Sequence, residues 1–247
     1  MLSVAGDVVC KLVKEAFVSG SFDPQLVETL IFVIPKEDNP TYMKQFRPIS
    51  LCDVIYKLIT KVLVNRLQPF LESLIGPLQS SFVPGRGTSD NALIAQKMMH
   101  FMHRSTSKQG SLAAKIDLEK AYDRVEWDIL QATLMEFVFP DITVRLIMFC
   151  IRSTNLTLLS NGSKLPSFAP TRGLRQGDPL SPYLFVICME KLSCLIAGMV
   201  EDNKWRPIHV SREGLCISHL FFIDDILLFT QATTTRVRLV NKALSDS

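Results

Sequence analysis

An Asp-Asp pair interrupts one of the most apolar segments of this chain. Residues 220–229 read LFFIDDILLF, and the pair consists of Asp224 and Asp225. Two adjacent carboxylates are costly to bury in such a segment unless a cation or a solvated turn offsets their charge. The apolar residues on both sides predict a β-hairpin with the aspartates at its turn. The fold must therefore contain a strand pair that presents carboxylates at one end.

A second aspartate stands at the end of another apolar strand pattern. Residues 111–116 predict a buried strand that leads directly to Asp117. Taken singly, Asp117 could cap a helix beginning at Leu118, and Asp224-Asp225 could be an ordinary hairpin turn. Taken together on two strands, the three carboxylates predict a two-metal centre for phosphoryl transfer. Mg²⁺ prefers such oxygen ligands, so it is the expected ion.

Composition narrows the class of protein without deciding its function. The chain has 247 residues, which suits one large domain or two closely packed subdomains. With 47% hydrophobic and 21% charged residues it is globular and not disordered. The net charge of +3 is too small to argue for nucleic acid by itself.

The spacing of the cysteines and the lack of a recognisable targeting segment indicate a protein of a reducing compartment. The six cysteines form no C-x-x-C or zinc-like pattern. Residues 1–20 lack a basic n-region and contain no convincing secretory signal. The apolar stretch 183–200 carries Glu190 and Lys191 near its middle, which argues against a membrane span. We expect a soluble nuclear or cytoplasmic protein without a membrane partner.

Periodicity predicts an irregular alternation of helices and strands. Expected helices cover residues 8–19, 50–74 with a possible break at Pro69, 89–104, 127–137, 141–152, 181–199 and 233 onward. Expected strands cover residues 29–34 and 111–116, with hairpins over 155–168, around Asn161-Gly162, and over 215–229. This order indicates an α+β fold with a small antiparallel sheet backed by helices.

Several segments follow one another in an order that is typical of one family. Residues 115–127 read KIDLEKAYDRVEW, and residues 173–185 read GLRQGDPLSPYLF. Shorter segments are IPK at 34–36, FRPISL at 46–51, QSSFVPGR at 79–86 and FIDD at 222–225. Together they resemble the fingers and palm motifs of LINE-type (non-LTR retrotransposon) reverse transcriptases, with a plant-like character. The resemblance extends from about residue 8 to residue 232.

The resemblance implies a fold, an activity and partners. The expected fold is the fingers and palm of a right-hand polymerase, with residues 1–88 as N-terminal extension and fingers and residues 89–247 as palm, ending before a thumb. The implied activity is RNA-directed DNA polymerase, which transfers a nucleotide from a dNTP to a primer 3′-hydroxyl. An RNA template and a DNA primer are the implied partners, and two Mg²⁺ ions, with Mn²⁺ as a possible substitute, are the implied cofactors.

The resemblance also implies a role for individual residues. Asp117 and Asp224 would be the principal metal ligands and Asp225 the weaker one. Tyr122 would pack under the sugar and exclude a 2′-hydroxyl; it could also be a core aromatic, and the two roles are compatible. The other implied nucleotide-binding residues are Lys36, Arg47, Leu118, Gln176 and Gly177. Contacts to the template or primer backbone are implied for Arg86, Arg172 and Arg175.

Some features depart from the family pattern. Ile223 stands where LINE enzymes usually have Ala, close to the expected primer end, where a bulky side chain could displace the terminus. No thumb is recognised in residues 233–247, and no endonuclease, RNase H or zinc-knuckle segment is found. Two other hypotheses therefore stay open: a catalytically silent retroelement remnant that at most binds nucleic acid, and an unrelated metal-dependent phosphotransferase. The latter does not explain residues 173–185.

Overall fold

The computed structural model describes residues 2–105, 110–209, 216–222 and 225–233, and the side chains from residue 6 onward. These residues form two compact units, each built from two stretches of chain. Unit 1 comprises residues 1–67 and 122–185, and unit 2 comprises residues 68–121 and 186–247. Helices α2 (Val54–Leu74) and α6 (Ser181–Glu201) run across the boundaries between these stretches. The predicted division into fingers and palm at residue 88 stays a prediction.

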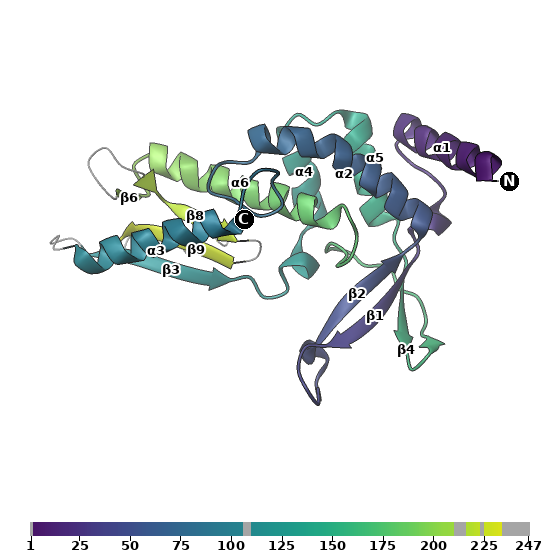
Figure 1. Cartoon of the computed structure of the whole chain (residues 1–247), viewed down its shortest axis with the longest axis horizontal. Coiled ribbons are helices and arrows are strands. Elements are labelled where there is room, and N and C mark those ends of the chain that lie inside the picture. The colour runs from purple at the N-terminus through teal and green to yellow at the C-terminus, as the bar shows by residue number, and fades with distance from the viewer. Residues whose placement is uncertain (1, 106–109, 210–215, 223–224, 234–247) are drawn as a thin grey trace. The chain divides into compact units, whose positions relative to one another are not determined.

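Unit 1 is built on a long antiparallel ribbon. Strand β1 (Thr29–Pro35) pairs along its whole length with β2 (Phe46–Cys52), and its other edge pairs in parallel with β4 (Leu156–Ser160). Strand β5 (Ser163–Lys164) completes a sheet of order β2-β1-β4-β5. The ribbon and the neighbouring β4 are clear in Figure 1.

The helices of this part of the chain are α1 (Leu2–Ser19), α2, α4 (Trp127–Glu136) and α5 (Asp141–Arg152), with the 3₁₀ turns η1 (Pro24–Val27) and η3 (Ala121–Arg124). A third 3₁₀ turn, η2 (Met43–Gln45), lies in the connection between β1 and β2 at the other end of the ribbon. Helix α5 has the strongest apolar face, and its Leu146, Ile147 and Cys150 are almost fully buried. Amphipathic spacing in the sequence predicted α4 and α5, and α5 begins and ends at the predicted residues.

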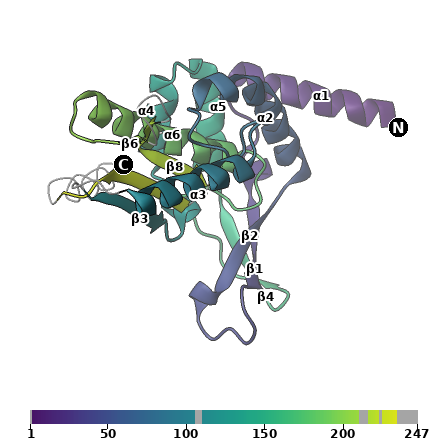
Figure 2. The same cartoon turned by 60° about the vertical axis from the view of Figure 1, so that its left-hand side comes forward.

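Unit 2 is an antiparallel sheet with helices. Its strand order is β3-β9-β8, from β3 (Ser111–Asp117), β9 (Asp225–Gln231) and β8 (His219–Phe222), and a separate pair joins β6 (Ile208–His209) to β7 (Cys216–Ile217). Helix α3 (Thr88–Arg104) contributes Met98 to a buried cluster with Leu220 and Phe229 of the sheet. Figure 2 shows α3 running beside β3 and β8. The predicted small antiparallel sheet backed by a helix is thus confirmed.

Helix α6 carries the longest apolar run among the described residues. By length and composition it is the one described helix that could cross a membrane, and 44% of its most apolar window is buried inside the protein. Burial of Leu184, Phe185 and Ile187 is also what the core helix of a globular protein shows.

Two predicted helices are wrong at their starts. Helix α1 begins at Leu2 instead of residue 8, and the second error concerns α2. Residues 50–52 were assigned to a helix, but they end strand β2, because residues 46–52 pair with the whole of β1. The helix begins only at Val54, where the Asp53 carboxylate accepts a hydrogen bond from the Ile55 backbone N–H at 2.7 Å. Pro69 lies inside α2 and does not end it.

The two hairpin predictions have different outcomes. Asn161 and Gly162 both adopt positive φ, 49° and 79°, and connect β4 to β5 as the Asn-Gly signal predicted. Strands β8 and β9 are antiparallel with Phe222 opposite Asp225, as expected for the second hairpin. Its predicted turn residues Ile223 and Asp224, and the helix predicted after Thr233, lie outside the described residues.

A buried histidine makes unit 2 sensitive to acid. His219 is 2% exposed, and its ring nitrogens lie 3.0 Å from Ser193 Oγ and 2.9 Å from Ser218 Oγ. Burial lowers the pKa of His219 to about 4 from its ordinary value of 6.5. The folded protein therefore binds this proton more weakly than the unfolded chain does. Its contribution to stability is complete above pH 6.5 and is lost as the pH falls toward 4.

We expect the free energy of unfolding to lose roughly 3 kcal/mol through His219 between pH 6.5 and 4, since one pKa unit corresponds to about 1.4 kcal/mol. Glu190, whose burial raises its pKa to about 6, acts in the opposite sense. The measurement is therefore the difference between wild type and His219→Gln in urea unfolding across this pH range. The exposed His100→Gln serves as the control. Equal pH slopes for wild type and His219→Gln would contradict the prediction.

Gly173 cannot accept a side chain, for two separate reasons. Its φ is +93°, and an added Cβ would lie 2.9 Å from the Asp123 carbonyl oxygen and 3.1 Å from the Asp123 Cα. Gly162 has a similar φ of +79° with nothing within 4 Å of its added Cβ. We expect Gly162→Ala to destabilise by about 1 kcal/mol through φ alone, and Gly173→Ala by about 1–3 kcal/mol more through the backbone clash. Urea unfolding of both variants measures the difference, and equal losses would refute the clash.

Candidate active site

The β3–β9 pairing places two of the predicted carboxylates opposite each other. Asp117 is the last residue of β3, Asp225 is the first residue of β9, and the two are direct partners in the antiparallel register. Direct partners point to the same face of a sheet, with Cβ atoms about 5 Å apart. Asp117 is exposed and Asp225 is half-buried. Two carboxylates thus lie side by side at one end of the sheet.

The register also places these aspartates and the neighbouring isoleucines on opposite faces of the sheet. Ile116 and Ile226, the neighbouring pair, point to the other face, where Ile226 is fully buried. Asp117 ends a strand and caps no helix, because the next helical turn, η3, begins only at Ala121. The simpler interpretation of Asp117 as an N-cap is therefore wrong.

A lysine on the same face partly offsets this negative charge. Lys115 lies two residues before Asp117, and its Nζ is 3.1 Å from Asp225 Oδ1. The side chains of Lys115 and Asp225 are 63% and 38% exposed, so the ion pair is solvated and adds little to stability. Nothing in the sequence pattern indicated this contact, which depends on the strand register.

The carboxylates suit a hard divalent cation. Oxygen ligands from one or two carboxylates, completed by water and phosphate, are typical of Mg²⁺ sites. Among the described residues no group of three His, Cys, Asp or Glu side chains gathers at one point. Asp224, the third predicted ligand, lies outside the described residues, so its participation stays a prediction.

The residues that follow Asp117 have partners of their own. The Leu118 carbonyl accepts a hydrogen bond from the Ala121 N–H at 3.2 Å and keeps a second lone pair. In unit 1, the Tyr122 ring stacks on Phe185, with centroids 4.8 Å apart and planes inclined by 14°. Tyr122 is half-buried, so one side of this ring packs into the unit, as the core-aromatic interpretation required.

The loop of residues 173–180 is attached to unit 1 at several points. Gly173 N–H donates to the Val125 carbonyl at 2.8 Å, and Trp127 Nε1 donates to the Gly173 carbonyl at 2.8 Å. Further along, the Gln176 carbonyl accepts from the Ser50 N–H at 2.7 Å. Gly177 has φ +101°, and an added Cβ would lie 3.0 Å from the Ser50 carbonyl oxygen. Glycine is thus required where the loop passes over β2.

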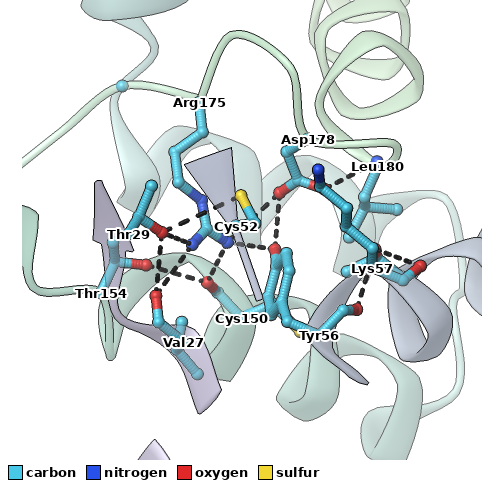
Figure 3. A network of polar contacts seen from close by, with 12 residues as sticks. Val27, Thr29, Cys52, Tyr56, Lys57, Cys150, Thr154, Arg175, Asp178 and Leu180 are labelled. Carbon is cyan, nitrogen blue, oxygen red and sulfur yellow. Dashed lines mark hydrogen bonds and ion pairs between the residues drawn. The ribbon is translucent and has the colours of Figure 1, made fainter. Parts of the chain in front are cut away.

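Arg175 corrects one prediction. Its side chain is 9% exposed and donates to five acceptors inside unit 1, as Figure 3 shows. The acceptors are the Val27 and Cys150 carbonyls, Thr29 Oγ1, Tyr56 Oη and Asp178 Oδ2. A guanidinium occupied in this way is not available to a nucleic-acid backbone. The predicted contact of Arg175 with template or primer is therefore wrong.

Arg86 corrects a second prediction. Its guanidinium donates to the carbonyls of Glu72, Ile75, Gly76 and Gln79. These carbonyls belong to the end of α2 and to the turn after it, where helical acceptors lack partners. Arg86 therefore closes the C-terminus of a helix and does not present its charge to nucleic acid.

The remaining predicted cations lie on the surface. Arg172 is exposed, with Nη1 3.1 Å from Glu126 Oε1, and it lines a hollow of unit 1 together with Gln176, Ser50 and Pro48. Arg47 is an exposed residue of β2 opposite Ile34. Lys36 follows β1 and its Nζ lies 3.4 Å from the Lys44 carbonyl. Their predicted contacts with phosphates stay predictions.

Sequence reasoning missed Tyr56. It is fully buried on α2, and its hydroxyl donates to Asp178 Oδ2 at 2.5 Å. In the sequence it reads as one more residue of an apolar helix face. The other carboxylate oxygen of Asp178, Oδ1, accepts a hydrogen bond from the Leu180 N–H at 3.0 Å, directly before α6. Only the fold brings Tyr56 and Asp178 together.

Comparison with known proteins gives consistent results. Residues 34–246 match the family described as reverse transcriptase (RNA-dependent DNA polymerase). The chain is 32% identical over 90% of its length to the transposon TX1 uncharacterized 149 kDa protein of Xenopus laevis. It is 27% identical over 85% of its length to the retrovirus-related Pol polyprotein from the type-2 retrotransposable element R2DM of Drosophila melanogaster. The chain spans 16% and 19% of these two relatives.

A solved structure supports the same fold. A telomerase from Candida tropicalis, determined in complex with a fragment of telomeric RNA, superposes with a TM-score of 0.61 at 14% identity. The match covers 97% of this chain and 41% of the telomerase chain. At this identity the likeness concerns the fold alone. The family match over residues 34–246 and the retrotransposon relatives show that the chain belongs to the reverse transcriptases, of the LINE (non-LTR retrotransposon) type.

Proposed function

We propose that this chain provides the nucleotidyl-transfer core of a LINE-type RNA-directed DNA polymerase. The observation that supports the proposal best is the direct pairing of Asp117 with Asp225 across β3 and β9 in a member of the reverse transcriptase family. Paired carboxylates at the end of two strands suit Mg²⁺, and Asp224 adjoins them in the sequence. An RNA template, a DNA primer and a dNTP are the proposed partners.

The proposed metal ligands are Asp117, Asp224 and Asp225, with Mn²⁺ as a substitute for Mg²⁺. Two bound ions would lower the pKa of the primer 3′-hydroxyl and stabilise charge on the leaving oxygen. The chain's own part is to hold these ligands in the register that β3 and β9 define. Lys115 adds a positive charge 3.1 Å from Asp225, which limits the repulsion between neighbouring carboxylates.

The proposed nucleotide contacts come from residues that are exposed or half-buried. Gln176 and Gly177 would offer an amide and a bare backbone surface, and the Leu118 carbonyl keeps one lone pair. Arg47 and Lys36 would bind the triphosphate, since Arg meets phosphate oxygens in pairs. Arg172, exposed beside Gln176 in one hollow, would contact the backbone of template or primer.

Primer extension tests this function. On an RNA template with Mg²⁺ and dNTPs, we expect wild type to extend a DNA primer. Asp117→Asn and Asp225→Asn should each lower kcat about a hundredfold or more, because a metal ligand contributes several kcal/mol to the transition state. The matched control is Asp128→Asn, which removes an exposed carboxylate paired with Arg152.

Magnesium titration adds a readout that does not need turnover. Isothermal titration should show weaker Mg²⁺ binding for both active-site variants and unchanged binding for Asp128→Asn. A folded wild-type protein that neither extends a primer nor binds Mg²⁺ would overturn the proposal and favour a catalytically silent remnant.

Tyr122 gives a separate prediction about sugar selection. If its ring lies under the sugar, a smaller side chain should admit a 2′-hydroxyl. We expect Tyr122→Val to lower the preference for dNTP over rNTP, as the ratio of kcat/KM values, by roughly tenfold or more. Tyr122→Phe keeps the ring that stacks on Phe185 and should keep the preference. Loss of preference in both variants, or in neither, would refute this role.

A further inference from the structure

The loop that carries Gln176 and Gly177 is held at both ends by buried polar side chains. Arg175 immediately precedes the two residues, and Asp178 immediately follows them. Their side chains are 9% and 4% exposed and form an ion pair, with Arg175 Nη2 3.2 Å from Asp178 Oδ2. Gln176 and Gly177 thus form the short span between two ends that are fixed to each other.

Arg175 ties this loop to two other segments of unit 1. Its Nη1 donates to Thr29 Oγ1 at 2.9 Å and to the Val27 carbonyl at 3.2 Å, at the start of the β1 ribbon. Its Nη2 donates to the Cys150 carbonyl of α5 at 2.9 Å. Figure 3 shows the guanidinium between these acceptors. The planar fork of arginine suits several fixed acceptors in a way that lysine does not.

Tyr56 connects both ends of the loop to α2. Its hydroxyl accepts a hydrogen bond from Arg175 Nη2 and donates one to Asp178 Oδ2 at 2.5 Å. The Arg175 guanidinium carbon also lies 4.3 Å from the centre of the Tyr56 ring. Burial, and then the Asp178 carboxylate, raise the pKa of Tyr56 well above its ordinary value, so the hydroxyl keeps the proton that it donates.

The span itself rests on β2. The Ser50 N–H donates to the Gln176 carbonyl at 2.7 Å, and the Gly177 backbone approaches the Ser50 carbonyl closely. A change at either end of the span would move the Gln176 amide and the Gly177 backbone relative to β2. Errors of about 1 Å in such positions can cost roughly a hundredfold in rate.

We propose that Tyr56, Arg175 and Asp178 are positioning residues that hold Gln176 and Gly177 against β2 and thereby set the affinity for the incoming nucleotide. The nucleotide part of this inference rests on the proposed function. A network of buried charges is no more stabilising than a well-packed apolar core, so a gain in stability does not explain why these three polar residues are buried here. The fixed geometry that they give to Gln176 and Gly177 does explain it.

Tyr56→Phe is the sharpest test, because it removes one oxygen atom and keeps the ring. Arg175→Lys is the second variant, since it keeps the charge and loses the fork. Arg152→Gln, which removes an exposed arginine of α5 that pairs with Asp128, is the matched control. Each protein is measured as the full chain by hydrogen exchange and by steady-state primer extension.

We expect faster exchange of the Ser50 and Leu180 amides in Tyr56→Phe and Arg175→Lys, with unchanged exchange in the β3–β9 sheet. The KM for dNTP should rise about tenfold, a loss of about 1.4 kcal/mol in binding, while kcat changes much less. A purely structural role would instead accelerate exchange throughout the unit and leave the KM unchanged. That result, or unchanged exchange at Ser50 and Leu180, would overturn the proposal.

The two proposals can fail separately. A wild-type protein that extends no primer would overturn the proposed function and the nucleotide part of this inference. The exchange rates of Ser50 and Leu180 still decide whether the three residues hold the loop. A normal wild-type activity with unaltered KM in both variants would overturn the positioning role alone.

Discussion

The antiparallel register of β3 with β9 is the constraint on which the rest of unit 2 depends. Seven residue pairs join the strands, from Ser111 opposite Gln231 to Asp117 opposite Asp225. A shift of one residue would turn Ile226 to the face on which Asp225 now lies and move Asp225 to the face where Ile226 is buried. Burial of Ile226 and Leu228 on one face therefore fixes the position of the Asp225 carboxylate on the other face. The burial of apolar side chains thus determines where the Asp117 and Asp225 carboxylates lie, at one end of the sheet.

In unit 1, buried polar side chains hold a functional segment in position. The loop after Gly173 has few apolar side chains to pack, so hydrogen bonds from Arg175, Tyr56 and Asp178 hold it in place. This explains why arginines in a nucleic-acid polymerase motif need not contact nucleic acid. Arg175 and Arg86 both donate hydrogen bonds to backbone carbonyls. Arg172, three residues before Arg175, keeps its charge at the surface.

Sequence reasoning succeeded where one interaction dominates. Helices α3, α4 and α5 follow apolar spacing, and the Asn161-Gly162 turn follows from the positive φ that it requires. It failed at Ser50, whose apolar neighbours fit a helix as well as a strand until β1 pairs with them. It also wrongly predicted nucleic-acid contacts for Arg86 and Arg175, because the sequence of a motif does not show whether its basic side chains are buried or exposed. Lys115 and Tyr56 escaped notice because their partners lie more than a hundred residues away.

The sequence by itself determined the family, the α+β class and the identity of the candidate carboxylates, because motif order and local periodicity are properties of neighbouring residues. Only the tertiary structure decided that Asp117 faces Asp225, that Lys115 pairs with Asp225, and that Arg175 points inward. These facts depend on strand register and burial, which arise from contacts between distant segments. A local sequence pattern identifies residues that can take part in such contacts. It does not show which distant segment they pair with, because that depends on the free energy of the whole fold.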